Sequence, residues 1–281
     1  MKGLTYGTSV LLMLVLGCTS ATQNKDSKTE SLEIRELEPA IRDSLDSANV
    51  VGSVLIFDPS KNTYYSNDYN RAYNVFLPAS TFKIPNSIIA LELGNAVDEN
   101  TIIPWDSTVR DNKNWNQDLT LEEAYGYSCV PCYQALARKA GVFNMKTQLE
   151  RMEYPGMVFD SSSVDLFWLQ GESRISQRQQ VDFLQKLKTK QLPLKPSTYT
   201  AMKKIMLFDQ TDDYAIYAKT GMAIRDTVTY GWFVGYVETK GNTYYFATNI
   251  APGEGMDLWG EFVPARIEVT LQALRYCDIL N

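Results

Sequence analysis

The order of strand-like and helix-like segments restricts the fold of this 281-residue chain more than any other feature. Residues 50–57 form an apolar run typical of a buried strand, and strand-like runs return at 214–220, 227–238 and 243–250. Helical spacing dominates between them and predicts several helices, one of them at residues 177–188. Strands at both ends with helices inserted between them predict an α+β fold: an antiparallel sheet flanked by helices, plus a helical subdomain.

Residues 32–281 are long and apolar enough for one large domain, since 44% of the chain is hydrophobic. Apolar residues at helical spacing from Leu32 to Leu45 predict a helix at its start. A net charge of −6 argues against nucleic acid or an anionic membrane surface as a partner. An anionic small substrate would need a local cationic pocket.

The first 18 residues are typical of a bacterial lipoprotein signal peptide. Lys2 precedes an apolar core at residues 10–16, and the segment ends in Val15-Leu16-Gly17-Cys18. We expect lipid on Cys18, a flexible polar tether at 19–31, and a periplasm-facing place in the bacterial cell envelope, with the membrane reached only through that lipid. The alternative is an ordinary signal peptide with an incidental cysteine.

Cys129 and Cys132 have the C-x-x-C spacing, but no thioredoxin-like strand and helix precede them. That context argues against redox catalysis. It leaves a local disulfide or a pair of small buried thiols, and we expect the thiols. The chain has no histidine and no second cysteine pair, so we expect no metal centre.

The missing histidine also governs the interpretation of Ser80 and Lys83. A serine nucleophile needs a base, and here an imidazole cannot supply it. Lys83 follows Ser80 by three residues, which places both side chains on one helix face at the start of an apolar run. The spacing alone is also that of a helix-capping serine followed by a solvated lysine.

Two further motifs favour the interpretation of Ser80 and Lys83 as a nucleophile and its base. Lys219-Thr220-Gly221 closes or continues a predicted strand, and its glycine would permit a close approach of ligand to backbone. Ser128-Cys129-Val130 lies between the two motifs in the chain. The order Ser-x-x-Lys, Ser-x-Val, Lys-Thr-Gly matches the signature of penicillin-recognising serine enzymes.

The wider motifs resemble those of the class D β-lactamases, the oxacillinase type, over roughly residues 50–275. The segments that carry this resemblance are Pro78-Ala79-Ser80-Thr81-Phe82-Lys83-Ile84-Pro85-Asn86, Ser128-Cys129-Val130, Phe167-Trp168-Leu169-Gln170-Gly171, Lys219-Thr220-Gly221 and Tyr230-Gly231-Trp232-Phe233-Val234-Gly235. The resemblance implies the β-lactamase/transpeptidase-like fold and hydrolysis of β-lactam antibiotics through an acyl-enzyme on Ser80.

The resemblance also assigns roles to residues that reach the substrate. Ser128, helped by Lys219, would pass a proton to the leaving β-lactam nitrogen. The backbone N–H groups of Ser80 and Met222 would form the oxyanion hole. The substrate carboxylate would be bound by Thr220, Gly221 and Arg266.

In this family the lysine that matches Lys83 reacts with carbon dioxide to become N6-carboxylysine, a carbamate that serves as general base. Trp168 would donate a hydrogen bond to that group and Val130 would shield it from water. Carbon dioxide or bicarbonate is therefore the one small molecule expected besides the substrate. Many relatives carry an acid where this chain has Gln170.

Two alternatives share the nucleophile and the lysine: a penicillin-binding sensor domain and a peptidoglycan peptidase. Both are acylated by penicillins but do not turn over. Sensor domains normally follow several transmembrane helices, whereas this chain has one short apolar segment. The Phe167-Trp168-Leu169 match favours a class D enzyme over a peptidase.

Overall fold

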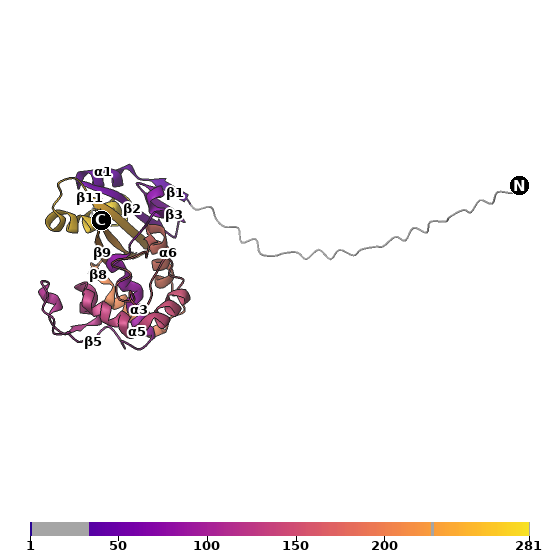
Figure 1. Ribbon diagram of the computed structural model, residues 1–281. Helices are drawn as coiled ribbons and strands as arrows, with labels where there is room; N and C mark the ends of the chain where they lie inside the picture. Colours follow the sequence, from indigo (N-terminus) through magenta and orange to yellow (C-terminus); the bar gives the residue numbers. More distant parts are fainter. Residues whose placement is uncertain (2–33, 226–227, 281) are drawn as a thin grey trace. The chain divides into compact units, whose positions relative to one another are not determined.

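The computed structural model describes Met1 and residues 34–225 and 228–280, so the predicted signal peptide, tether and Cys18 lie outside the described residues (Figure 1). Residues 33–281 form one unit. Its sheet has seven strands, in the order β1 (Ile34–Leu37), β3 (Thr63–Ser66), β2 (Val50–Asp58), β11 (Thr243–Pro252), β10 (Val228–Thr239), β9 (Tyr214–Arg225) and β8 (Leu207–Gln210). Every neighbouring pair is antiparallel except β1 and β3.

Helices cover both faces of this sheet, which confirms the predicted α+β class. The α-helices are α1 (Pro39–Ser47), α2 (Tyr69–Tyr73), α3 (Lys83–Glu92), α4 (Leu121–Gly126), α5 (Val130–Arg151), α6 (Gln177–Lys188), α7 (Pro196–Ile205) and α8 (Val263–Tyr276). Short turns of 3₁₀ helix lie at η1 (Ala79–Phe82) and η2 (Lys113–Trp115), and a π-turn, η3 (Leu258–Phe262), precedes α8. Four short strands form two separate ladders, β4 (Val75–Phe76) with β7 (Ile175–Ser176), and β5 (Ile102–Ile103) with β6 (Leu119–Thr120).

The alternation of side chains along β2 shows why the sheet is buried on both faces. Val54 and Ile56 belong to a core shared with α1 and α8, while Leu55 and Phe57 belong to a larger core shared with α3, α5 and α6. In Figure 1 the helices α3 and α5 lie in the half of the unit opposite α1 and the yellow C-terminal helix. The larger core supports the predicted site.

The predicted N-terminal helix was wrong over its first residues. Ile34–Leu37 forms β1, parallel to Thr63–Ser66, and the helix begins only at Pro39. Proline lacks an N–H and suits the first helical turn, where that group has no partner. The apolar residues before Pro39 that suggested a helix therefore belong to a strand, which pairs with residues far along the chain.

No helix in residues 34–225 or 228–280 is long and apolar enough to cross a membrane.

Candidate active site

Ser80 and Lys83 lie at the junction of η1 and α3. Lys83 is the first residue of α3, and its Nζ donates a hydrogen bond to Ser80 Oγ at 2.9 Å. Ser80 is half-buried, whereas Lys83 is only 1% exposed. The spacing predicted that these side chains share one face, and the structure joins them as a reachable hydroxyl and a buried amine, so Lys83 is not a solvated lysine.

Among the described residues, the surroundings of Lys83 offer a positive charge only a serine hydroxyl and the face of one aromatic ring. No carboxylate pairs with it among the described residues, and the ring of Tyr133 lies 5.2 Å from Nζ. Burial, followed by the charge of Lys219, holds the pKa of Lys83 well below its usual value. This lowered pKa favours the neutral amine, which can accept a proton or react with an electrophile.

Trp168 is buried against Phe82, the residue before Lys83. Its side chain has no exposed surface and stacks on Phe82, with ring centroids 5.3 Å apart. Its Nε1–H is buried and has no hydrogen-bond partner within the described residues. A buried N–H without an acceptor is costly, so this position favours an acceptor that the bare side chains do not supply. Gln170, by contrast, is exposed.

Ser128 lies in the turn between α4 and α5. Its φ of 52° is in the left-handed region, and its N–H donates to the carbonyl of Tyr125 at 3.1 Å. Tyr125 in turn donates its hydroxyl to Ala218 O on β9, at 3.2 Å. This contact ties the Ser128 turn to the strand that carries Lys219. Val130, half-buried, begins α5.

The Lys219-Thr220-Gly221 motif lies within β9, which continues to Arg225 and so settles the alternative between closing and continuing the strand. A methyl group at Gly221 would lie 3.2 Å from Thr81 Cγ2 and 3.3 Å from Thr81 N. Glycine therefore allows β9 to lie directly against the η1 turn that holds Ser80. Met222 follows on the same strand, in register with Gly231 on β10.

Two cations lie along this side of the site. Lys219 is 4% exposed, and its Nζ donates to Thr220 O at 3.1 Å. Burial, followed by the charge of Arg266, lowers the pKa of Lys219 to about 7. Arg266 of α8 donates from Nη1 to Gly221 O and from Nε to Val263 O, each at 2.8 Å. Burial lowers the pKa of Arg266 to about 10, so its guanidinium is charged at neutral pH.

Three residues of the Tyr-Gly-Trp motif have positioning roles that the sequence did not reveal. The hydroxyl of Tyr230 accepts the N–H of Leu77 at 2.8 Å, and Trp232 Nε1 donates to Leu77 O at 3.0 Å. Both bonds anchor β10 to the segment just before η1. A methyl group at Gly231 would overlap Arg266 Cδ, so only glycine leaves room for that side chain. The Tyr-Gly-Trp motif was the signal in the sequence that could have pointed to these positioning roles.

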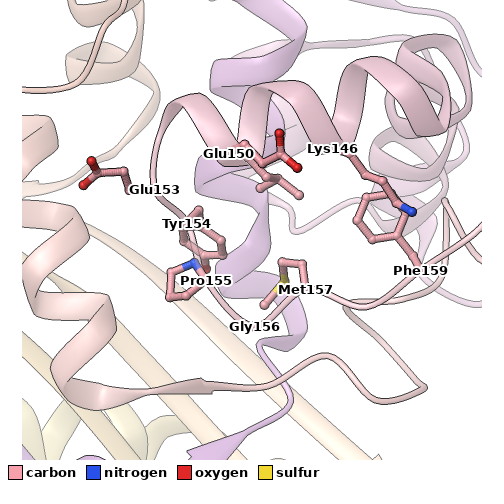
Figure 2. A pocket seen from close by; sticks show the side chains of 9 residues that line it. Lys146, Glu150, Glu153, Tyr154, Pro155, Gly156, Met157 and Phe159 are labelled. Carbon is pink, nitrogen blue, oxygen red and sulfur yellow. The ribbon is translucent and has the colours of Figure 1, made fainter.

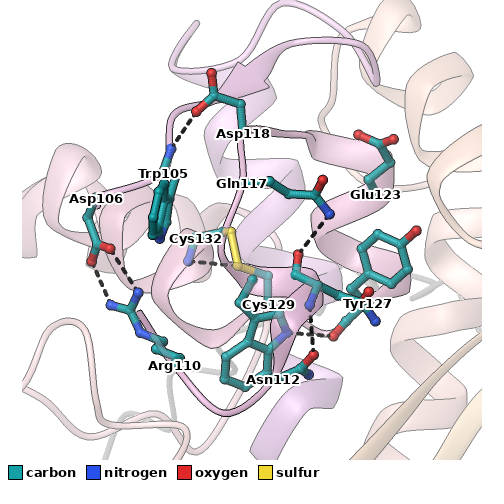
Figure 3. The surroundings of a disulfide bond; sticks show 12 residues. Trp105, Asp106, Arg110, Asn112, Gln117, Asp118, Glu123, Tyr127, Cys129 and Cys132 are labelled. Carbon is teal, nitrogen blue, oxygen red and sulfur yellow. Dashed lines mark hydrogen bonds and ion pairs between the residues drawn. A yellow bond between two sulfur atoms is a disulfide. The ribbon is translucent and has the colours of Figure 1, made fainter. Parts of the chain in front are cut away.

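The expectation of two free thiols at residues 129 and 132 was wrong. Cys129 and Cys132 form a disulfide, with their Cα atoms 5.4 Å apart (Figure 3). Cys129 caps α5 and Cys132 lies in its first turn, which brings the two sulfurs together. The capping turn, which the spacing alone did not predict, therefore decides the pairing.

A surface cavity of about 390 Å³ lies outside this constellation, between α5 and the segment that follows it (Figure 2). Its lining includes Lys146, Glu150 and Tyr154, and none of the predicted site residues. Within the described residues no group of three or more histidine, cysteine or acidic side chains could hold a metal.

Comparisons with known proteins agree with the geometry. Residues 49–267 match the model of the penicillin binding protein transpeptidase domain. The chain is 42% identical to Beta-lactamase OXA-48 of Klebsiella pneumoniae over 199 residues, which is 71% of this chain and 75% of that protein.

Two solved structures extend the likeness. The class D β-lactamase YbXI from Nostoc superposes with a TM-score of 0.82 at 36% identity, covering 87% of this chain and all of that one. The C-terminal domain of the Bacillus licheniformis BlaR penicillin-receptor superposes with a TM-score of 0.80 at 27% identity, covering 88% and 97%. An enzyme and a receptor thus share this architecture.

Proposed function

This chain belongs to the class D β-lactamases, and we propose that it hydrolyses β-lactam antibiotics with Ser80 as nucleophile and a carbamate on Lys83 as general base. The observation that carries the proposal is the 2.9 Å hydrogen bond between Ser80 Oγ and a lysine buried without a counter-ion among the described residues. A base in that place can take the hydroxyl proton as oxygen attacks the β-lactam carbonyl.

The surroundings of Lys83 support the modified form. Addition of CO₂ to a neutral lysine amine gives a carbamate and releases one proton, so the depressed pKa favours the reaction. When present, the group supplies a carboxylate-like base for both acylation and the later attack of water. The unpartnered Nε1–H of Trp168 would donate to it, and Val130 would exclude bulk water. Both residues fit such a group.

The tetrahedral intermediate needs donors for its oxyanion and a proton for the leaving nitrogen. We assign the donors to the backbone N–H groups of Ser80 and Met222. Ser128 would give its hydroxyl proton to the nitrogen, and Lys219 would supply a new proton to the Ser128 hydroxyl. A pKa of about 7 suits Lys219 to this exchange near neutral pH.

The cations of β9 and α8 would hold the substrate carboxylate. Arg266 reaches the carbonyl of Gly221, which places its charge at the strand edge where Thr220 lies half-buried. A carboxylate there would receive bonds from a charged donor and a hydroxyl. This local charge acts against the net charge of −6 of the whole chain.

The receptor-like relative keeps a second candidate open: a penicillin-binding sensor domain that acylates once. The two are separated by mixing the protein with an excess of nitrocefin. Our proposal predicts sustained hydrolysis over many turnovers. A burst of one equivalent followed by a stable acyl-enzyme in mass spectra would contradict it and support a sensor or a peptidoglycan peptidase.

The carbamate is tested separately, because it forms reversibly. We expect added bicarbonate to raise the turnover rate, and CO₂-depleted, mildly acidic buffer to lower it. Unchanged turnover in both conditions would exclude a carbamate base while leaving β-lactam hydrolysis intact.

We also propose export and lipidation at Cys18, supported by the sequence Val15-Leu16-Gly17-Cys18. Mass spectrometry of the mature protein from bacterial membranes should find an N-terminal diacylglyceryl cysteine. A mature chain beginning at another residue would contradict it.

A further inference from the structure

The disulfide closes the first turn of α5 onto the turn that carries Ser128 (Figure 3). Cys129 directly follows Ser128, and the bonded ring encloses Val130 and Pro131. Cys129 has no exposed surface and Cys132 is 9% exposed. The bond therefore lies in the core and constrains the two residues on either side of Cys129.

The backbone of this turn needs such a constraint. Ser128 has a φ of 52°, a conformation that non-glycine residues adopt only where their surroundings impose it. Cys129 N–H donates to Ala124 O at 2.8 Å, which fixes one side of the turn. On the other side, the cap of α5 is Cys129 Sγ, which accepts the N–H of Cys132 at 3.2 Å. Sulfur is a weak acceptor, so the covalent bond carries a role that a capping oxygen fulfils elsewhere.

Packing around the ring is incomplete on its outer side. A cavity of about 40 Å³ lies between Cys132 and the side chains of Trp105, Arg110 and Trp115. Trp115 lines this cavity, and its Nε1 donates to Tyr127 O at 3.0 Å. This free space would let the turn relax if the bond between the sulfurs were opened.

We propose that the Cys129–Cys132 disulfide is a positioning element that holds Ser128 at the leaving nitrogen and Val130 over the base. The inference rests on the roles proposed above for these two residues. Opening the bond should slow acylation but lower the free energy of unfolding only slightly. The closed loop contains only two intervening residues, so the bond restricts the entropy of the unfolded chain little.

The test is Cys132→Ala in the otherwise unchanged chain, with Cys132→Ser as a second variant of different polarity. We expect both to lose about tenfold in the single-turnover acylation rate with nitrocefin, since small displacements of reacting groups are costly. The melting temperature should change little. Acylation at the parental rate in both variants, or a loss of rate that only accompanies unfolding, would overturn the proposal.

Reduction of the parent protein tests the same bond without changing a side chain. Dithiothreitol gives two electrons and two protons to the disulfide and becomes its own cyclic disulfide, leaving thiols on Cys129 and Cys132. The reductant is removed before the assay, and alkylation should add two labels relative to the oxidised protein. We expect the reduced parent to acylate as slowly as Cys132→Ala. Reduction should not change the acylation rate of Cys132→Ala itself. A reduced parent that carries two added labels and still acylates at its oxidised rate would contradict the proposal.

Cys277→Ser is the matched control, because Cys277 is a free, half-buried cysteine outside the proposed site. It should keep both the parental rate and its sensitivity to reduction. The oxidised parent serves to separate the two proposals: if it does not turn over nitrocefin, the proposed function fails, whereas equal rates in parent and variant contradict only the positioning role.

Discussion

The two buried lysines of the site differ in what surrounds them. Lys83 begins α3 next to the rings of Phe82 and Tyr133, and among the described residues its Nζ donates only to Ser80 Oγ. Lys219 lies on β9 and donates to the carbonyl oxygen and hydroxyl of Thr220, with Arg266 close enough to lower its pKa. Both are buried, but the acceptor of Lys83 is the hydroxyl of Ser80, whereas the acceptors of Lys219 are the carbonyl and hydroxyl oxygens of the neighbouring Thr220.

That difference explains how one amino-acid type can serve two purposes. Burial of Lys83 favours the neutral amine, and we propose that the indole N–H of Trp168, which has no partner among the described residues, donates to an anionic group added there. The region of Lys219 and Arg266 retains positive charge near neutral pH and presents it to a substrate anion. We therefore propose that the α3 side of the site supplies the base, while the β9 side supplies charge for substrate binding and, through Lys219, a proton for the leaving nitrogen.

The largest effect should follow from removing the base. Lys83→Ala should remain folded and lose about 10⁴-fold in kcat for nitrocefin, because acylation and deacylation then lack the same group. The exposed Lys146→Ala is the control and should keep the parental rate. Parental turnover by Lys83→Ala would remove the distinction between the two lysines.

A smaller loss is expected from Trp168→Phe. Phenylalanine keeps the stacking on Phe82 but lacks Nε1–H, so a bond to a charged acceptor is lost, worth about 100-fold in kcat at ambient CO₂. Saturating bicarbonate should restore part of the rate if the indole stabilises a carbamate. A loss that bicarbonate does not relieve would place the role of Trp168 in packing alone.

On the β9 side, Arg266→Ala should act on binding and leave the chemistry of Ser80 in place. We expect about a tenfold rise in KM with a smaller change in kcat, because a charged hydrogen bond to the substrate carboxylate is lost. Gly231→Ala should act in the same direction by displacing the Arg266 side chain. Steady-state kinetics decides this; a fall in kcat at constant KM would argue against an anchor.

The smallest effect concerns stability and pH. Lys219 has a folded pKa of about 7 against an ordinary value of 10.5, so the unfolded chain binds more protons between these limits. Stability should therefore rise with pH across this window, and Lys219→Met should reduce the rise between pH 7 and pH 9 by about 2 kcal/mol. Urea titrations of both proteins measure it. Parallel curves would show that Lys219 titrates near its ordinary value.

Local patterns in the sequence predicted much of this arrangement. The helical run at residues 177–188 matches α6 residue for residue, and the i, i+3 spacing of Ser80 and Lys83 predicted their contact. Both depend on neighbours in the chain. The order of three motifs was enough to indicate the site, although not the distances between its parts.

Features that depend on distant pairing were not predictable in the same way. β1 carries helical spacing but pairs with residues about 30 positions further along the chain. The approach of Gly221 to Thr81 and the bonds from Tyr230 and Trp232 to Leu77 join segments over 130 residues apart. The disulfide was missed because its formation depends on how α5 begins.

The proposed mechanism depends most on Lys83 acting as a carbamate. The direct test is ¹³C NMR of the protein equilibrated with ¹³C-labelled bicarbonate, run beside Lys83→Ala. We predict a carbamate resonance in the parent that is absent from the variant and disappears when CO₂ is removed, in step with the rate of nitrocefin turnover. No such resonance in a protein that hydrolyses nitrocefin at its full rate would contradict the claim.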